Sequence, residues 1–189
     1  MKKRWTLPVL VLLCGGLLFT GCRTPEAPPA TPESAAENLA KGIRLDADIT
    51  FRDIQAEAQI VRDSSGLYQI ELTSPSHLKG LSATFDGQTV QISYLGFQFD
   101  VDAADYPEVS LASSIAQVLD EAAAGTAESM TKTDLGYVLT GETDSGSYSL
   151  YLDLETLAPI SLAVPDLELS CTFSPIPESS VSSAPEESL

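Results

Sequence analysis

The chain has 189 residues, of which 27 are acidic and ten basic, and its formal net charge is −17. A protein this negative is repelled by nucleic-acid phosphates and by anionic lipid head groups, so we exclude both as partners of its surface. The length allows one domain with a substantial hydrophobic core.

The first 21 residues have the composition of a bacterial export signal. Basic residues occupy positions 2–4, and an uncharged apolar run extends from Leu7 to Phe19. A membrane-spanning helix needs about 20 apolar residues, so this run is too short to be one. The layout is that of a secretory signal peptide, and we expect residues 1–21 to be removed.

Cys22 lies where the apolar run stops, and it resembles the lipidated cysteine of bacterial lipoproteins. The segment Phe19-Thr20-Gly21 before it is similar to a lipobox, although Phe19 stands where leucine is preferred. The resemblance implies that Cys22 carries a diacylglyceryl thioether, which anchors the mature protein to the extracytoplasmic side of the cell membrane. An uncleaved anchor or a coincidental cysteine is the alternative interpretation.

The mature chain, residues 22–189, keeps seven basic and all 27 acidic residues, so its net charge is −20. We interpret this charge as a means of keeping a surface-tethered domain soluble. With Cys22 lipidated, Cys171 has no partner for an intrachain disulfide. Cys171 follows the apolar alternation of Leu167, Leu169 and Phe173, which predicts a buried side chain rather than a reactive thiol.

A proline-rich linker, residues 22–30, is expected to separate the anchor from the folded domain. A short helix follows it, because Thr31 can serve as N-cap, Pro32 favours a first turn and Gly42 favours a stop. The apolar residues of this helix recur at fourfold spacing, at Ala35, Leu39 and Ile43.

Alternating apolar and polar residues predict strands both before and after one long helix. The helix is expected between a cap at Ser110 and an end at Gly125, and its apolar stripe consists of Leu111, Ile115, Val118, Leu119 and Ala122. Strand patterns precede it at 45–51, 56–60, 68–72, 81–85, 90–94 and 97–101, and follow it at 137–139, 148–154, 160–164 and 167–173.

The predicted fold is α+β and mostly β, with about nine antiparallel strands in one strongly curved sheet, or half-barrel. One short N-terminal helix and one inserted amphipathic helix are scarcely enough to cover such a sheet unless it curls around them. We assign residues 31–173 to this domain. Residues 174–189 are Ser, Pro and Glu with little to bury, and we expect them to form a disordered acidic tail.

Residue patterns typical of catalysis or metal binding are missing from the sequence. His77 is the single histidine, so a two-histidine metal site is impossible. The carboxylates between Asp100 and Asp105 lack the glycine and the bidentate glutamate of an EF-hand loop. No phosphate-binding glycine loop or nucleophile elbow occurs. We therefore expect no enzyme activity, no cofactor and no metal.

The order of elements resembles the LolA/LolB-like superfamily of lipoprotein carriers and the related lipid-binding lipoproteins. The segments that carry the likeness are Leu67–Pro75, Leu78–Leu81, Phe85–Val90 and Tyr148–Asp153 followed by Pro159. The resemblance implies a bent antiparallel sheet whose concave side, closed by helices, holds acyl chains. We find no counterpart of the arginine that some carriers have in this cavity.

Two hypotheses of function follow from the resemblance. The first is a membrane-anchored envelope lipoprotein that binds a lipid or another hydrophobic ligand in the half-barrel, with Ile115, Leu119, Phe85 and Tyr94 at the cavity. The second is a non-enzymatic envelope lipoprotein whose filled sheet is a scaffold for a protein partner. A cavity deeper than one layer of side chains would distinguish the first from the second.

Overall fold

A computed structural model of the protein describes residues 30–85, 89–101 and 107–176, and in the second helix it describes side chains from Leu111 onward. The predicted export signal, Cys22, most of the predicted linker and most of the predicted tail lie outside the described residues.

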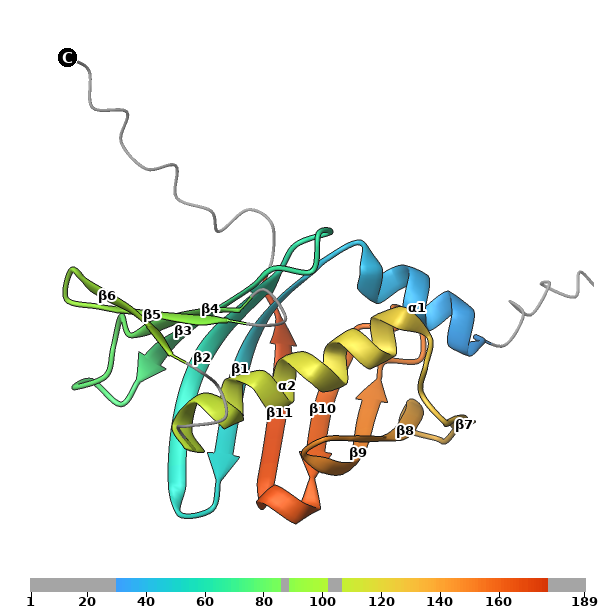
Figure 1. Ribbon diagram of the computed structural model, residues 1–189. Coiled ribbons are helices and arrows are strands. Elements are labelled where there is room, and N and C mark those ends of the chain that lie inside the picture. The colour runs from blue at the N-terminus through green and yellow to red at the C-terminus, as the bar shows by residue number, and fades with distance from the viewer. Residues whose placement is uncertain (1–29, 86–88, 102–106, 177–189) are drawn as a thin grey trace, which may run out of the picture.

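All strands of the described chain belong to one antiparallel sheet (Figure 1), which confirms the predicted fold class. Its order is β6-β5-β4-β3-β2-β1-β11-β10-β9-β8-β7. The helices are α1 (Pro32–Ala40), α2 (Pro107–Ala124) and the 3-10 helix η1 (Pro165–Leu167). The strands are β1 (Ile43–Phe51), β2 (Ile54–Arg62), β3 (Tyr68–Ser74), β4 (Ser82–Phe85), β5 (Val90–Tyr94), β6 (Phe97–Val101), β7 (Ser129–Lys132), β8 (Tyr137–Thr143), β9 (Gly146–Leu152), β10 (Pro159–Val164) and β11 (Leu169–Pro175).

The pairing of the first strand with the last joins two meanders into this single sheet. Strands β1 to β6 form one meander and β7 to β11 the other, and α2 is inserted between them. In the β1–β11 pair, Ala47 lies opposite Phe173 and Ile49 opposite Cys171. The sheet curls around α2 (Figure 1), and we call the face that carries α2 the inner face.

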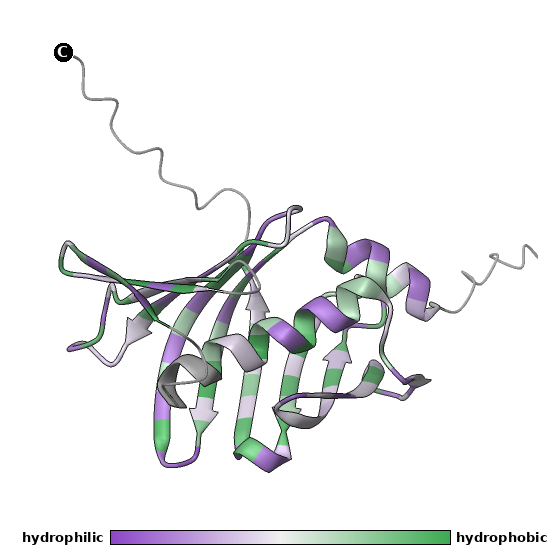
Figure 2. Ribbon diagram, in the orientation of Figure 1, coloured by the Kyte–Doolittle hydropathy of each residue, from purple (hydrophilic) through white to green (hydrophobic). Residues whose placement is uncertain are grey.

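The core lies between the inner face and the apolar stripe of α2. On β1, the inward residues Leu45, Ala47 and Ile49 are buried and the residues between them are exposed, as the alternating hydropathy in Figure 2 illustrates. Ile115 is 0% exposed and Leu119 is 1% exposed. The predicted stripe therefore faces the sheet, and side chains fill the space beneath the helix.

Helix α1 begins as the sequence predicts. The Thr31 side chain accepts a hydrogen bond from the Ser34 N–H, and the Ser34 hydroxyl accepts one from the Thr31 N–H, which forms a capping box. Just before the helix, the Ala30 N–H donates to the Tyr137 hydroxyl on β8 at 3.1 Å. The start of the folded domain is therefore fixed beside β8.

Three details differ from the sequence prediction. Helix α2 begins at Pro107, one turn earlier than expected, so Ser110 lies inside the helix and is not its cap. The edge strand β7 was missed because only Met130 in it is apolar and partly buried. The sheet also continues beyond Phe173: Ser174 and Pro175 pair with β1, and the Ile176 N–H donates to the Arg44 carbonyl at 3.1 Å.

Cys171 lies in the core, as its apolar phase predicts. Its side chain is 2% exposed, and burial raises the pKa of the Cys171 thiol to about 12. Because the thiolate is the reactive form, this thiol is inert at neutral pH.

We predict that Ile115→Ala lowers the free energy of unfolding by about 2–5 kcal/mol, because it leaves a cavity in a filled core. Leu135 is 81% exposed, so Leu135→Ala should change that free energy by about 0.5 kcal/mol or less. Urea denaturation of the two variants measures the difference. A similar small loss in both would show that the space beneath α2 is not filled.

Candidate binding surface

Apolar side chains occupy the part of the inner face that extends past α2. These residues lie opposite one another on neighbouring strands: Ala83 pairs with Ile92, and Ile92 pairs with Phe99. They share the face of the buried residues Phe85 and Val90, because inward residues alternate along each strand. We call this surface the open face, and it consists of Leu72, Ala83, Ile92, Phe97 and Phe99.

The two phenylalanines of the open face are strongly exposed. Phe97 is 74% exposed and Phe99 is 50% exposed, whereas Leu72, Ala83 and Ile92 are partly buried against the core. The exposure of the two phenylalanines follows from the position of α2, whose closest contacts with the sheet are at β4 and β8. The β5–β6 hairpin extends beyond α2 (Figures 1 and 2), so its inward side chains have no helix above them in the described chain.

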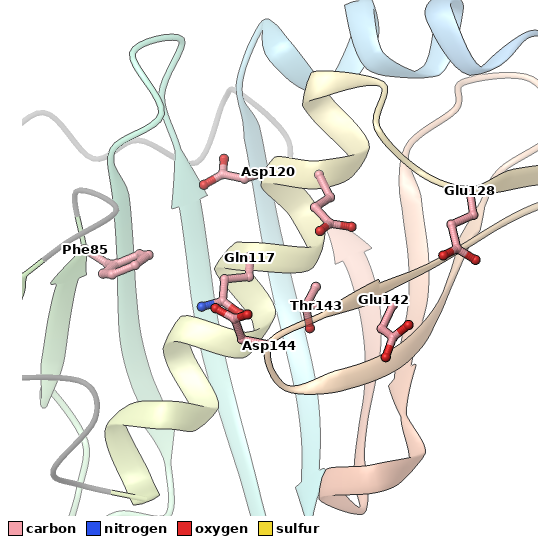
Figure 3. A pocket seen from close by; sticks show the side chains of 8 residues that line it. Phe85, Gln117, Asp120, Glu128, Glu142, Thr143 and Asp144 are labelled. Atoms are coloured by element: carbon pink, nitrogen blue, oxygen red, sulfur yellow. The ribbon is translucent and has the colours of Figure 1, made fainter.

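A second feature, which we call the acidic pocket, lies along the polar side of α2 and has a volume of about 730 Å³. In Figure 3, Gln117 and Asp120 project from α2 between Phe85 on one side and Glu128 and Glu142 on the other. The lining residues are Phe85, Gln117, Asp120, Glu121, Glu128, Glu142, Thr143 and Asp144. Five of these eight carry carboxylates, and the lining includes no basic residue.

Asp120 is the pocket carboxylate that an ion pair ties to the sheet. Arg62 Nε donates to Asp120 Oδ1 at 2.9 Å, and the Tyr68 hydroxyl donates to the same oxygen at 3.0 Å. Burial disfavours the charged guanidinium, yet the interactions with Asp120 and Tyr68 together outweigh this effect and raise the pKa of Arg62. Burial, with the nearby Asp120 charge, raises the pKa of Tyr68 as well. This network ties α2 to β2 and β3.

Tyr148 places its hydroxyl near Glu121, a residue of the pocket lining. The residue is 2% exposed, and its hydroxyl makes no well-aligned hydrogen bond. Its ring lies over Gly141, where an added Cβ would be 2.7 Å from the hydroxyl oxygen. Burial raises the pKa of Tyr148, and the charge of Glu121, the contact of the hydroxyl with the Glu121 carboxylate and the charge of Glu128 raise it further.

Gln117 contributes an unsatisfied group at the same place. Its side-chain oxygen Oε1 is buried and accepts no hydrogen bond from the protein. The pocket thus contains an excess of hydrogen-bond acceptors over donors. Within the described ranges, no three His, Cys, Asp or Glu side chains are close enough together to hold a metal ion.

The four residues predicted to line a ligand cavity lie in three different places. Ile115 and Leu119 belong to the filled core and reach neither surface. Phe85 is 6% exposed and lines the acidic pocket. Tyr94 shares the inner side of β5 with Ile92, pairs with Phe97, and donates its hydroxyl to the His77 carbonyl at 2.6 Å.

The sequence prediction missed both the acidic pocket and the buried arginine. The pocket acids come from α2, from the segment before β7 and from the end of β8. They are far apart in the sequence, so no local spacing pattern predicts that they form one pocket. Arg62 has a side chain only 11% exposed. The sequence did contain one indication of the ion pair. Asp120 directly follows Leu119 of the apolar stripe, so its side chain lies beside the buried face of the helix and can reach the sheet.

No protein-family model and no curated protein matches the sequence. Solved structures do resemble the chain, among them an uncharacterised conserved protein from Thermus thermophilus, with 12% identity and a TM-score of 0.45, covering 82% of this chain and 93% of that one. A LolA superfamily protein from Nitrosomonas europaea shows 11% identity and a TM-score of 0.37, covering 77% and 92%. The Mycobacterium tuberculosis lipoprotein LppX shows 9% identity and a TM-score of 0.36, covering 76% and 91%.

These likenesses are remote, with identities of 9–12% and TM-scores of 0.36–0.45, and none of them assigns a function to the surfaces described above.

We predict that Asp120→Ala lowers the free energy of unfolding by about 1–3 kcal/mol, because it leaves the largely buried Arg62 without its anion. Asp120→Asn should cost less, since its amide oxygen still accepts hydrogen bonds. The exposed pocket residue Glu142 supplies the control, and Glu142→Ala should be nearly neutral. If urea denaturation gives Asp120→Ala and Glu142→Ala the same stability, the network does not hold α2.

Proposed function

We propose that the protein is a lipid-anchored, extracytoplasmic binding protein that holds a partner protein on its open face. The observation that carries this proposal is the exposure of Phe97 and Phe99 beside a partly buried apolar floor. Contiguous exposed apolar residues mark interaction sites, and buried aromatic anchors supply much of the binding energy in protein interfaces. The function is binding rather than catalysis.

A protein surface suits the open face better than an enclosed lipid does. Sites for small apolar ligands are concave and bury most of the ligand. Here the residues expected to line such a cavity, Ile115 and Leu119, are packed within the core. The pocket beside the open face is lined by carboxylates. An acyl chain would gain little there, whereas a partner surface could cover the open face.

The start of the described domain and the open face lie toward opposite edges of the sheet. Ala30, which follows the predicted linker, is held beside β8, while β6 forms the far edge of the sheet (Figure 1). Among the described residues, no helix is long and apolar enough to cross a bilayer. The lipid on Cys22 would supply the attachment, and the open face would remain accessible to a partner at the envelope.

Lipidation is tested by labelling cells with a fatty-acid analogue. We expect the wild-type protein to be labelled and to fractionate with membranes, and Cys22→Ala to do neither, because Cys22 alone follows the lipobox-like segment. Cys14→Ala serves as the matched control and should behave as wild type. Equal labelling of wild type and Cys22→Ala would contradict the proposal.

The open face is tested by a photo-crosslinking residue placed at Phe99 in cells of the native organism. The same residue at Thr50, exposed on the outer side of β1, is the control. We expect a discrete protein adduct from position 99 that disappears with Phe97→Ser, and none from position 50. Adducts that contain only phospholipid would favour a lipid-binding function instead, and equal adducts at both positions would contradict any role for the open face.

A further inference from the structure

The acidic pocket and the open face are parts of one continuous surface. On β4, Phe85 lines the pocket and Ala83, the next inward residue, belongs to the open face. Ala83 pairs with Ile92 of the open face, so β4 carries residues of both surfaces. A ligand that covers the open face therefore meets the pocket at its edge.

The pocket is strongly negative. Its lining contains no basic residue, and Arg62 at its edge is paired with Asp120. Glu121, Glu128, Glu142 and Asp144 all line it, and the ion pair at its edge joins Arg62 to Asp120. Like charges gathered in a pocket raise the local concentration of counter-ions and focus the field there. The partner surface at the pocket is therefore expected to be positive.

Two buried polar atoms add to the excess of acceptors at the pocket. The Tyr148 side chain is 2% exposed, and its hydroxyl interacts with the Glu121 carboxylate without a well-aligned hydrogen bond; the Gln117 Oε1 has no hydrogen-bond partner. Unsatisfied buried polar atoms are uncommon in native structures and call for an explanation. Both oxygens can accept hydrogen bonds from N–H groups, and an ammonium or guanidinium group supplies several such donors.

The negative net charge of the protein disfavours other classes of partner at this surface. A second copy of this chain would bring another mature charge of −20 against the first, and an acidic peptide or anionic lipid would be repelled in the same way. A single metal ion does not suit carboxylates that, among the described residues, do not gather in threes. An apolar and basic protein segment complements both parts of the surface.

We infer that the partner presents a basic amphipathic segment, whose apolar side chains cover the open face while its lysine or arginine side chains enter the acidic pocket. This inference rests on the proposed function, because it assigns a chemistry to the partner of the open face. Phe85 lies at the junction, where an aromatic ring can also contact the stem of a long basic side chain.

The test measures binding of short fluorescent peptides to the purified domain by anisotropy. An amphipathic leucine–lysine peptide is compared with a leucine–glutamate peptide of the same pattern and with a scrambled leucine–lysine peptide. We expect the amphipathic basic peptide to bind at least about tenfold more tightly than either. Its affinity should fall as salt is raised, because mobile ions screen charges beyond about 8 Å at physiological ionic strength.

Two variants that lose the same number of charges show whether the pocket acids contribute to peptide binding. The pocket variant carries Glu121→Gln, Glu128→Gln, Glu142→Gln and Asp144→Asn. The control variant loses the same number of charges from the exposed outer face, through Asp46→Asn, Asp48→Asn, Glu57→Gln and Glu71→Gln. We expect the pocket variant to weaken binding about tenfold or more, and the control variant to weaken it far less.

Tyr148→Phe isolates the buried hydroxyl. It should weaken the basic peptide about three- to tenfold, as the loss of one hydrogen bond does, and should change the melting temperature of the free domain little, because the hydroxyl makes no well-aligned hydrogen bond there. Equal binding by the pocket and control variants, or by the basic and acidic peptides, would overturn the inference.

The double variant Phe97→Ser with Phe99→Ser separates the two proposals. If it weakens every amphipathic peptide while the pocket variant weakens none, the open face binds a partner but the inference about basic chemistry fails. If the pocket variant weakens binding and the double variant does not, the proposed function of the open face fails. Weakening of the basic peptide by both variants supports both proposals.

Discussion

The helix α2, with the short helix α1 beside it, has to cover the inner face of a sheet of eleven described strands, and this constraint shapes the molecule. The apolar stripe of α2, centred on Ile115 and Leu119, is removed from water only if the sheet curls around it. Curling brings β4 and β8 to the helix from opposite sides. The β5–β6 hairpin remains beyond its reach, so an apolar surface is left open there.

The polar side of the same helix creates the acidic pocket. Asp120 binds Arg62 and Tyr68 on the sheet, and this fixes the rotation of α2 about its axis. With that rotation fixed, Gln117 and Glu121 face the carboxylates near β7 and β8. The open face and the acidic pocket are thus two consequences of how one amphipathic helix packs, and that is why they adjoin at Phe85.

The sequence predicted the parts of this fold that depend on local periodicity. Alternation along each strand, the stripe of α2 and the Thr31 cap each express burial or hydrogen bonding within a few residues, so they could be recognised. The acidic pocket could not, because Glu128 and Asp144 approach α2 only after the sheet has folded. Which inner-face residues α2 leaves exposed, such as Phe97 and Phe99, likewise depends on how far the sheet curls, which periodicity does not encode.

The central claim is that α2 fills one part of the inner face and leaves another part open. Hydroxyl-radical footprinting of the purified mature protein tests it directly, because it reports the solvent access of each phenylalanine. The account predicts strong oxidation of Phe97 and Phe99, which are 74% and 50% exposed, and protection of Phe51 and Phe173, which are 6% and 4% exposed. Protection of Phe97 and Phe99 equal to that of Phe51 would contradict it.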